Sequence, residues 1–199
     1  MNQINEKALV LIGFQNDYFS PDGILYNVIE ESSRITGVLE NTLELLRKAG
    51  REFGLVVNTP IHFTEDYSEL KEPIGILKTI KEVGAFKENT YGAQIIEQLD
   101  AFSDIVKMVP GKRGLNAFFS TNLENILKDS GIKEIVFAGT VTSICIDSTA
   151  RSAVDLGFQV TILEDCTSSR TPFEQIFYCE EVFPLYAHVS SSKALISES

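Results

Sequence analysis

The chain lacks most of the residues that mark secreted, metal-rich or nucleic-acid-binding proteins. It has no tryptophan, two histidines and three cysteines among 199 residues. Three cysteines without close spacing exclude the disulfide framework of a small secreted domain, so we expect reduced thiols and a cytoplasmic protein. Basic residues are also few, because 17 lysines and arginines stand against 28 aspartates and glutamates, for a net charge of -11. That charge repels a phosphate backbone and argues against a nucleic-acid partner.

Long apolar runs are absent too. The longest of them, at 8–14 and 135–138, fall far short of the ~20 residues that span a bilayer, so no membrane association is expected. The first residues contain no basic stretch leading into an apolar region, which argues against a secretion signal. A hydrophobic content of 44% with 23% charged residues is typical of a folded globular chain. The length of 199 residues predicts one domain spanning 1–199.

Buried strands alternate with amphipathic helices along the chain. Strands are predicted at 8–12, 55–57, 104–109, 134–139, 159–163 and 185–189. Helices are predicted from Ile35 to Gly50, through 95–99, near 123–127, over 143–156 and over 173–178, with a short one inside the long segment 59–91. The strand at 8–12 is apolar at every position, as expected when helices cover both faces of a sheet. The pattern predicts an α/β fold, three-layer and Rossmann-like, with a mostly parallel central sheet of about six strands.

Reactive side chains are expected beyond the carboxyl ends of the strands, where open parallel sheets bind ligands. Cys145 lies in the turn between the strand at 134–139 and the helix after it. Free N–H groups and the positive end of a helix dipole favour a thiolate there and can also bind an oxyanion. Lys112, between Gly111 and Gly114 after the strand at 104–109, can reach the same crevice. The alternatives are a small core cysteine and a solvated surface lysine.

Three separated segments together resemble the isochorismatase-like cysteine hydrolases, a superfamily that includes nicotinamidases, N-carbamoylsarcosine amidases and ureide amidases. Residues 9–19 resemble its opening strand and the Gln-Asn-Asp-aromatic signature that follows. Residues 112–118 resemble its Lys-x-x-x-Ser-Ala-Phe block, with Asn116 in place of the serine. Residues 139–153 resemble its Gly-x-x-Thr-x-x-Cys-x-x-x-Thr-Ala-Arg-x-Ala block. The resemblance covers nearly the whole chain.

The resemblance implies a cofactor-independent hydrolase with an Asp–Lys–Cys triad, which cleaves a C–N bond of a small amide, ureide or imide through a thioester. Cys145 matches the nucleophile and Lys112 the lysine. A cis peptide is then expected between Thr140 and Val141, with the amides of Val141 and Cys145 directed at the oxyanion. The resemblance further implies a small-molecule substrate and a homo-oligomer.

The chain departs from this pattern at the catalytic aspartate, whose position Gly13 occupies. A missing base puts ordinary turnover in doubt, since acid–base assistance is typically worth ~10²–10⁴-fold. The alternative is an inactive family member that binds a small metabolite or a partner. A weaker one is a sensor in which Cys145 forms reversible adducts. His62, after the second strand, is a candidate base, although a structural histidine is the more common case.

Other polar and aromatic groups complete the predicted site. Nicotinamidases bind a metal through an Asp-x-His motif, and here Pro60-Ile61-His62 lacks the aspartate, so we expect no metal and disfavour nicotinamide. Gln15, His62 and Phe118 are possible substrate-pocket residues. We expect His188, in the last strand, and Cys166 and Cys179 to be buried structural side chains.

Overall fold

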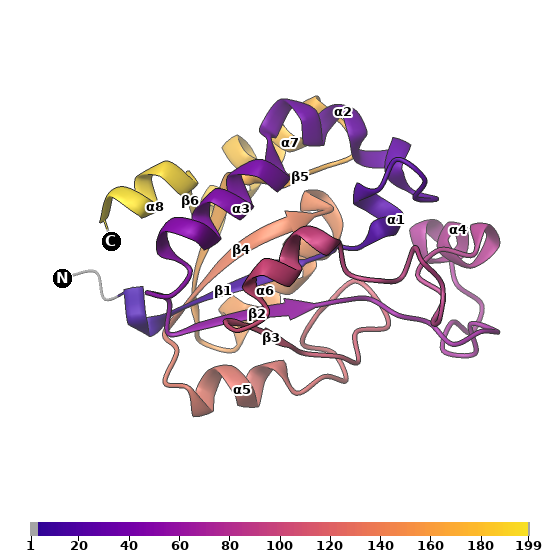
Figure 1. Cartoon of the computed structure of the whole chain (residues 1–199), viewed down its shortest axis with the longest axis horizontal. Helices are drawn as coiled ribbons and strands as arrows, with labels where there is room; N and C mark the ends of the chain where they lie inside the picture. Colours follow the sequence, from indigo (N-terminus) through magenta and orange to yellow (C-terminus); the bar gives the residue numbers. More distant parts are fainter. Residues whose placement is uncertain (1–3, 199) are drawn as a thin grey trace.

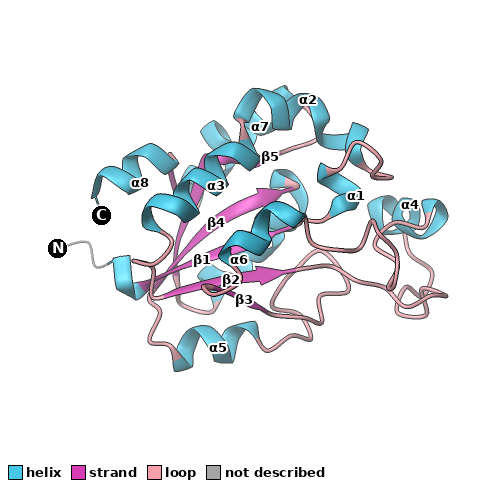
Figure 2. Ribbon diagram, viewed as in Figure 1, coloured by secondary structure: helices cyan, strands magenta, loops and turns pink. Residues whose placement is uncertain are grey.

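A single parallel sheet organises the chain and confirms the predicted α/β class. The computed structural model describes residues 4–198, and its six strands lie in the order β3-β2-β1-β4-β5-β6 (Figures 1 and 2). The strands are β1 (Lys7–Ile12), β2 (Leu55–Thr59), β3 (Val106–Met108), β4 (Glu134–Thr140), β5 (Gln159–Ser168) and β6 (His188–Ser190). From β1 the chain adds β2 and β3 on one side, and then β4, β5 and β6 on the other side of β1. The switch point, where such sheets bind ligands, therefore lies at the carboxyl ends of β1 and β4.

Helices cover both faces of the sheet. Figure 1 shows α3 and α8 on one side and α5 on the other. The α-helices are α1 (Asn16–Phe19), α2 (Tyr26–Thr36), α3 (Val38–Ala49), α4 (Gly75–Val83), α5 (Leu123–Asp129), α6 (Asp147–Asp155), α7 (Pro172–Phe177) and α8 (Ser192–Glu198). Shorter turns are the 3-10 helices η1 (Ile4–Glu6), η2 (Glu97–Phe102) and η5 (Phe183–Leu185) and the π-helical turns η3 (Thr142–Ile146) and η4 (Tyr178–Val182). Among these described helices, none combines the length and apolarity of a membrane span.

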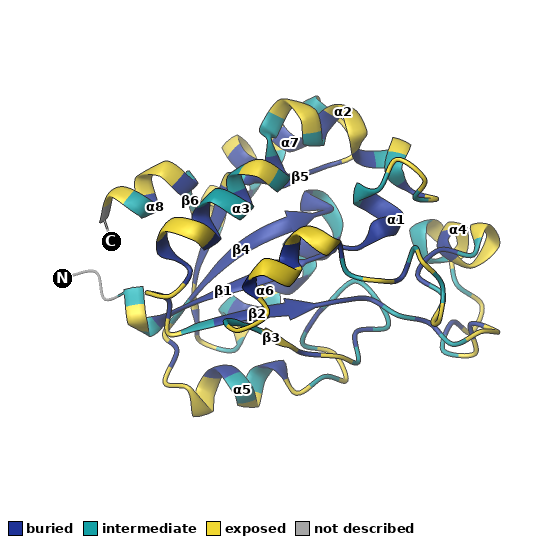
Figure 3. Ribbon diagram, viewed as in Figure 1, coloured by how far each residue is buried: buried dark blue, intermediate teal, exposed yellow. Residues whose placement is uncertain are grey.

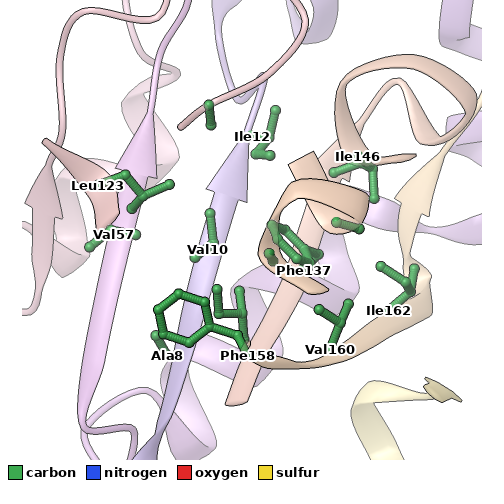
Figure 4. Close-up of a cluster of buried hydrophobic side chains, with 14 of the residues drawn as sticks. Ala8, Val10, Ile12, Val57, Leu123, Phe137, Ile146, Phe158, Val160 and Ile162 are labelled. Carbon is green, nitrogen blue, oxygen red and sulfur yellow. The ribbon is translucent and has the colours of Figure 1, made fainter. Parts of the chain in front are cut away.

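The unbroken apolar runs of β1 and β4 follow from their central place in the sheet (Figure 3). Successive side chains of a strand point to opposite faces, so both faces of a covered strand require apolar residues. Val10 and Phe137 face one cluster, which Figure 4 shows with Phe158 and Val160. Leu9 and Val136 face the second cluster, beneath α3.

The helix predicted from Ile35 to Gly50 is in fact two helices. Gly37 has a φ of 68°, which ends α2 at Thr36, and α3 begins at Val38. A left-handed residue cannot continue a right-handed helix, and glycine adopts that conformation without a steric penalty. Ile35 belongs to α2 and is 59% exposed. The prediction that it shares the apolar face of the helix now seen as α3 is therefore wrong. The region predicted as a helix through 95–99 is the 3-10 helix η2, which begins at Glu97.

The end of the chain also differs from the prediction. The last strand covers His188–Ser190 rather than 185–189, and Leu185 is 82% exposed. His188 is an exposed residue of this short edge strand, so the core position expected for it is wrong. Cys166 and Cys179 are buried, as expected.

The long segment between β2 and β3 contains the predicted short helix, α4. Its neighbours form a third apolar cluster in which Phe63 and Phe86 pack with Tyr18 of α1 and with Val141. Val141 directly follows β4. This cluster therefore joins the long segment to the carboxyl-terminal edge of the sheet, where the candidate site lies.

Candidate active site

Cys145 lies beyond the carboxyl end of β4, in the π-helical turn η3 that leads into α6. The sequence predicts one helix over 143–156, but the first turn is wider: the N–H of Ile146 donates to the carbonyl of Val141 at 3.2 Å. Such single wide turns are often found at functional sites. Cys145 as a residue is 7% exposed and packs into the apolar cluster on the α6 side of the sheet.

Lys112 reaches the same point from the loop after β3. Its side chain is buried, with 1% of the residue exposed. Its Nζ donates to Cys145 Sγ at 3.5 Å and to the carbonyl of Gly114 at 2.5 Å. The backbone of Lys112 is fixed to the strand-like segment after β2, because its carbonyl accepts from the N–H of His62 at 3.2 Å. An ammonium buried this deeply is stabilised by an opposing negative charge, which a thiolate can provide.

A non-proline cis peptide joins Thr140 to Val141, at the position that the resemblance implies. The side chain of Thr140 is held by the end of β5, since its Oγ1 donates to the carbonyl of Ser168 at 2.9 Å. The carbonyl of Thr140 lies against Gly13, the first residue after β1.

Gly13 fits this place because it has no side chain. Its φ is +79°, and an ideal Cβ built on it would lie 2.6 Å from the carbonyl oxygen of Thr140. Gly139, in the paired strand, has a φ of +130°, and a Cβ there would collide with the carbonyl of Ile12. Side chains at either position would therefore require β1 and β4 to move apart.

Two neighbouring residues of α7 support the cysteine turn. Gln175 Oε1 accepts from Thr142 Oγ1 at 2.6 Å, and Gln175 Nε2 donates to Thr167 Oγ1 at 3.1 Å. Glu174 acts through Ser169, whose hydroxyl donates to Glu174 Oε2 at 2.5 Å and lies 3.1 Å from Ser143 Oγ. Neither residue was predicted from the sequence to belong to the site. The sequence carries one signal for this helix, a threonine at its N-cap position: Thr171 Oγ1 accepts from the N–H of Glu174 at 3.1 Å.

The Glu174 carboxylate is strongly stabilised in this network. Burial by itself would raise its pKa, but hydrogen bonds from Arg170 and Ser169 outweigh burial and lower the pKa to about 2. Arg170 approaches the carboxylate with its Nη2 at 2.6 Å. The segment between β5 and α7 is thereby fixed beside the cysteine turn.

Gln15, predicted to line a substrate pocket, is instead fully engaged in the structure. It is 0% exposed. Its Nε2 donates to the carbonyls of Ile61 at 2.9 Å and Ala93 at 2.7 Å, and its Oε1 accepts from the N–H of Ile61 at 2.9 Å. These bonds tie the loop after β1 to the loop after β2, and they use both N–H groups of the amide.

The side chains of His62 and Phe118 are held by contacts with other residues than the reactive pair. A ring nitrogen of His62, Nε2, is 2.9 Å from the carbonyl of Ala93. The ring borders an open cavity of about 410 Å³ that Arg113 also lines. Phe118 is half-buried and stacks on Phe158 at a centroid distance of 6.4 Å. Of the predicted side chains, the structure thus brings Lys112 and Cys145 into direct contact.

The two histidines cannot coordinate the same metal ion. His62 follows β2, whereas His188 is in β6, and β1, β4 and β5 separate these strands. Within residues 4–198, no three cysteine, histidine, aspartate or glutamate side chains are grouped as metal ligands.

Comparison with known proteins places these features in a family context. The family model of the isochorismatase domain matches residues 7–194. The chain is 30% identical over 202 residues to the isochorismatase family protein YddQ of Bacillus subtilis, covering 95% of this chain and 98% of that protein. It is 27% identical over 214 residues to the ureidoacrylate amidohydrolase RutB of Agrobacterium fabrum, covering 98% and 92% of the two chains. The structure of the nicotinamidase PncA of Bacillus subtilis is similar with a TM-score of 0.71 at 25% identity, covering 94% and 99%.

The network of Glu174 generates a pH-dependent prediction. Since its folded-state pKa lies below the ordinary value of 4.5, its ionised form stabilises the fold above pH 4.5, and this contribution is lost as the pH falls towards 2. Glu174→Gln should therefore lower the free energy of unfolding at pH 7, by on the order of 1 kcal/mol because Arg170 is half exposed. The difference from the unmodified chain should shrink below pH 4.5 in denaturant titrations. A difference that stays constant from pH 7 to pH 2.5 would contradict this role of Glu174.

Proposed function

The chain belongs to the isochorismatase family, and we propose that it is a cysteine-dependent amidohydrolase that cleaves a C–N bond of a small amide, ureide or imide. The observation that supports this most directly is the 3.5 Å contact between Lys112 Nζ and Cys145 Sγ at the switch point of the sheet. The proteins that are similar to this chain include one named as a ureidoacrylate amidohydrolase and one named as a nicotinamidase. Both names describe hydrolysis of a small amide-type molecule.

In the proposed reaction, Lys112 first takes the proton of the Cys145 thiol and becomes an ammonium beside a thiolate. The thiolate attacks the carbonyl carbon, and the N–H groups of Val141 and Cys145 stabilise the oxyanion. The C–N bond then breaks, and the leaving nitrogen takes the proton from Lys112. Water attacks the resulting thioester and gives a proton to Lys112. The carbon–sulfur bond breaks, which releases the acid and a thiolate, and Lys112 returns its proton to the thiolate. Thr140 holds the turn in place through Ser168.

Lys112 is the acid and the base in this scheme because no carboxylate assists it. Among the residues whose side chains the structure describes, its Nζ contacts Cys145 Sγ and the carbonyl of Gly114, and no ion pair joins it to a carboxylate. General acid–base assistance is typically worth ~10²–10⁴-fold in rate. We therefore propose slow turnover relative to a site with a complete triad.

A second candidate function is favoured by the backbone at Gly13. Its left-handed φ and the close carbonyl of Thr140 leave no room for a side chain. The catalytic aspartate that the resemblance implies at this position would therefore not fit in this conformation. A chain built in this way can bind a small amide beside Cys145 without hydrolysing it.

The first test measures release of ammonia or amine from a panel of small amides, ureides and imides. Cys145→Ala should abolish turnover, because it removes the nucleophile, and a thioester on Cys145 should be detectable by mass spectrometry in the unmodified chain. Cys166→Ala is the matched control, because that thiol lies in the apolar cluster on the opposite face of the sheet. Turnover that survives Cys145→Ala would exclude the cysteine mechanism.

The second test separates slow turnover from binding alone by comparing Gly13→Asp with Gly13→Ala. Both variants should lose stability by at least about 1–2 kcal/mol, because both place a Cβ at a left-handed residue, and only the aspartate adds a carboxylate. Slow turnover in the unmodified chain supports the hydrolase. Substrate binding without turnover, together with activity in Gly13→Asp but not in Gly13→Ala, supports the binding function. Equal activity in both variants would show that the carboxylate has no role.

A further inference from the structure

Lys112 and Cys145 belong to two loops that the sheet alone does not bring together. Lys112 follows β3 and Cys145 follows β4, and β2 and β1 lie between these two strands. Since neighbouring strands are about 4.8 Å apart, β3 and β4 are separated by about 14 Å. The loop after β3 must therefore reach across the sheet and be fastened near α6 for the two side chains to meet.

Thr149 of α6 fastens that loop to the backbone of the cysteine. Its Oγ1 accepts from the N–H of Ala117 at 3.1 Å and donates to the carbonyl of Cys145 at 2.7 Å. Both directions are fixed by chemistry, because an amide N–H can only donate and a carbonyl can only accept. One hydroxyl therefore joins the loop that carries Lys112 to the residue that carries the thiol.

The three residues of this bridge are buried. Thr149 and Ala117 are 0% exposed, and Cys145 is 7% exposed. Water therefore does not replace the hydroxyl easily as a partner of the Ala117 N–H. Because a buried N–H that loses its partner is costly, the hydroxyl of Thr149 strongly favours the position in which the loop is found.

The same loop surrounds the amine of Lys112. The carbonyl of Gly114 accepts from Lys112 Nζ at 2.5 Å. Two residues later, Asn116 Nδ2 donates to Ser152 Oγ of α6 at 2.5 Å. The loop thus contacts the amine in its middle and α6 at its far end. Of these two hydroxyls of α6, that of Thr149 also binds the backbone of the nucleophile.

We propose that Thr149 is a positioning residue, whose bridging hydroxyl holds the loop of Lys112 where the amine contacts the sulfur of Cys145. The inference rests on the proposed function, because it takes this 3.5 Å contact as the reactive centre. Thr149 acts through the backbones of Ala117 and Cys145 rather than on a substrate. Its effect is therefore present in the free protein and can be measured there.

The experiment follows the rate at which iodoacetamide alkylates Cys145 at pH 7, by peptide mass spectrometry. Thr149→Val keeps the branched shape of the side chain and removes the hydroxyl. It should slow alkylation about three- to tenfold, the value of one hydrogen bond. Thr149→Ser keeps the hydroxyl and should react as fast as the unmodified chain.

Thr42→Val is the matched control. Thr42 is also 0% exposed, and its Oγ1 donates at 2.6 Å to the carbonyl of Val38, four residues earlier in α3. Because α3 packs on the apolar cluster on the other face of the sheet from Cys145, this variant should lose a comparable hydrogen bond and leave the rate at Cys145 unchanged. Equal slowing in Thr42→Val and Thr149→Val would indicate a general loss of stability and would overturn the positioning role.

A double variant separates positioning of the lysine from a local effect on the cysteine turn. In Lys112→Met the bridge has no amine to position, so the addition of Thr149→Val should cause no further slowing. Slowing by the same factor with and without Lys112, or no slowing in Thr149→Val alone, would overturn the proposal. Failure of the hydrolase proposal would appear instead as absent turnover of every amide tested, and would leave these rates measurable.

Discussion

The contact between the buried amine of Lys112 and the sulfur of Cys145 is the interaction on which the rest of the site depends. Lys112 is 1% exposed, and its Nζ contacts Cys145 Sγ at 3.5 Å. Removing a charge from water is costly unless an opposite charge or strong acceptors meet it. A thiolate is the charge that this site can provide. The order of the strands, the wide turn after β4 and the hydrogen bond that Thr142 of this turn donates to Gln175 of α7 together bring the two groups into contact.

The sequence predicted the parts of the fold that depend on periodicity and burial. The apolar run of β1 indicated a covered parallel strand, and strand ends pointed to Cys145 and Lys112 as neighbours. It did not predict the break at Gly37, because a glycine within an amphipathic pattern does not reveal its φ. The hydrogen bonds of the Gln15 side chain could not be predicted either, because its partners are backbone groups of Ile61 and Ala93, which are distant in the chain. Features that depend on tertiary contacts of the backbone were therefore missed.

The chemistry of this edge of the sheet is unusual in its balance of charge. Lys112 Nζ and Cys145 Sγ face each other, no carboxylate joins them among the described side chains, and the backbone at Gly13 leaves no space for one. Such a site can hold a polar, uncharged group beside the sulfur, which is the character of an amide.

If Lys112 activates the Cys145 thiol, its removal should slow the reaction of that thiol with an alkylating reagent. The measurement is the rate at which iodoacetamide alkylates Cys145 at pH 7 in the unmodified chain, in Lys112→Met and in the exposed control Lys107→Met. Methionine has an unbranched side chain one atom shorter than that of lysine and carries no charge. Lys112→Met should slow alkylation about tenfold or more, the effect of about 1.4 kcal/mol, and Lys107→Met should leave the rate unchanged. Equal rates in all three proteins would show that Lys112 does not activate the thiol.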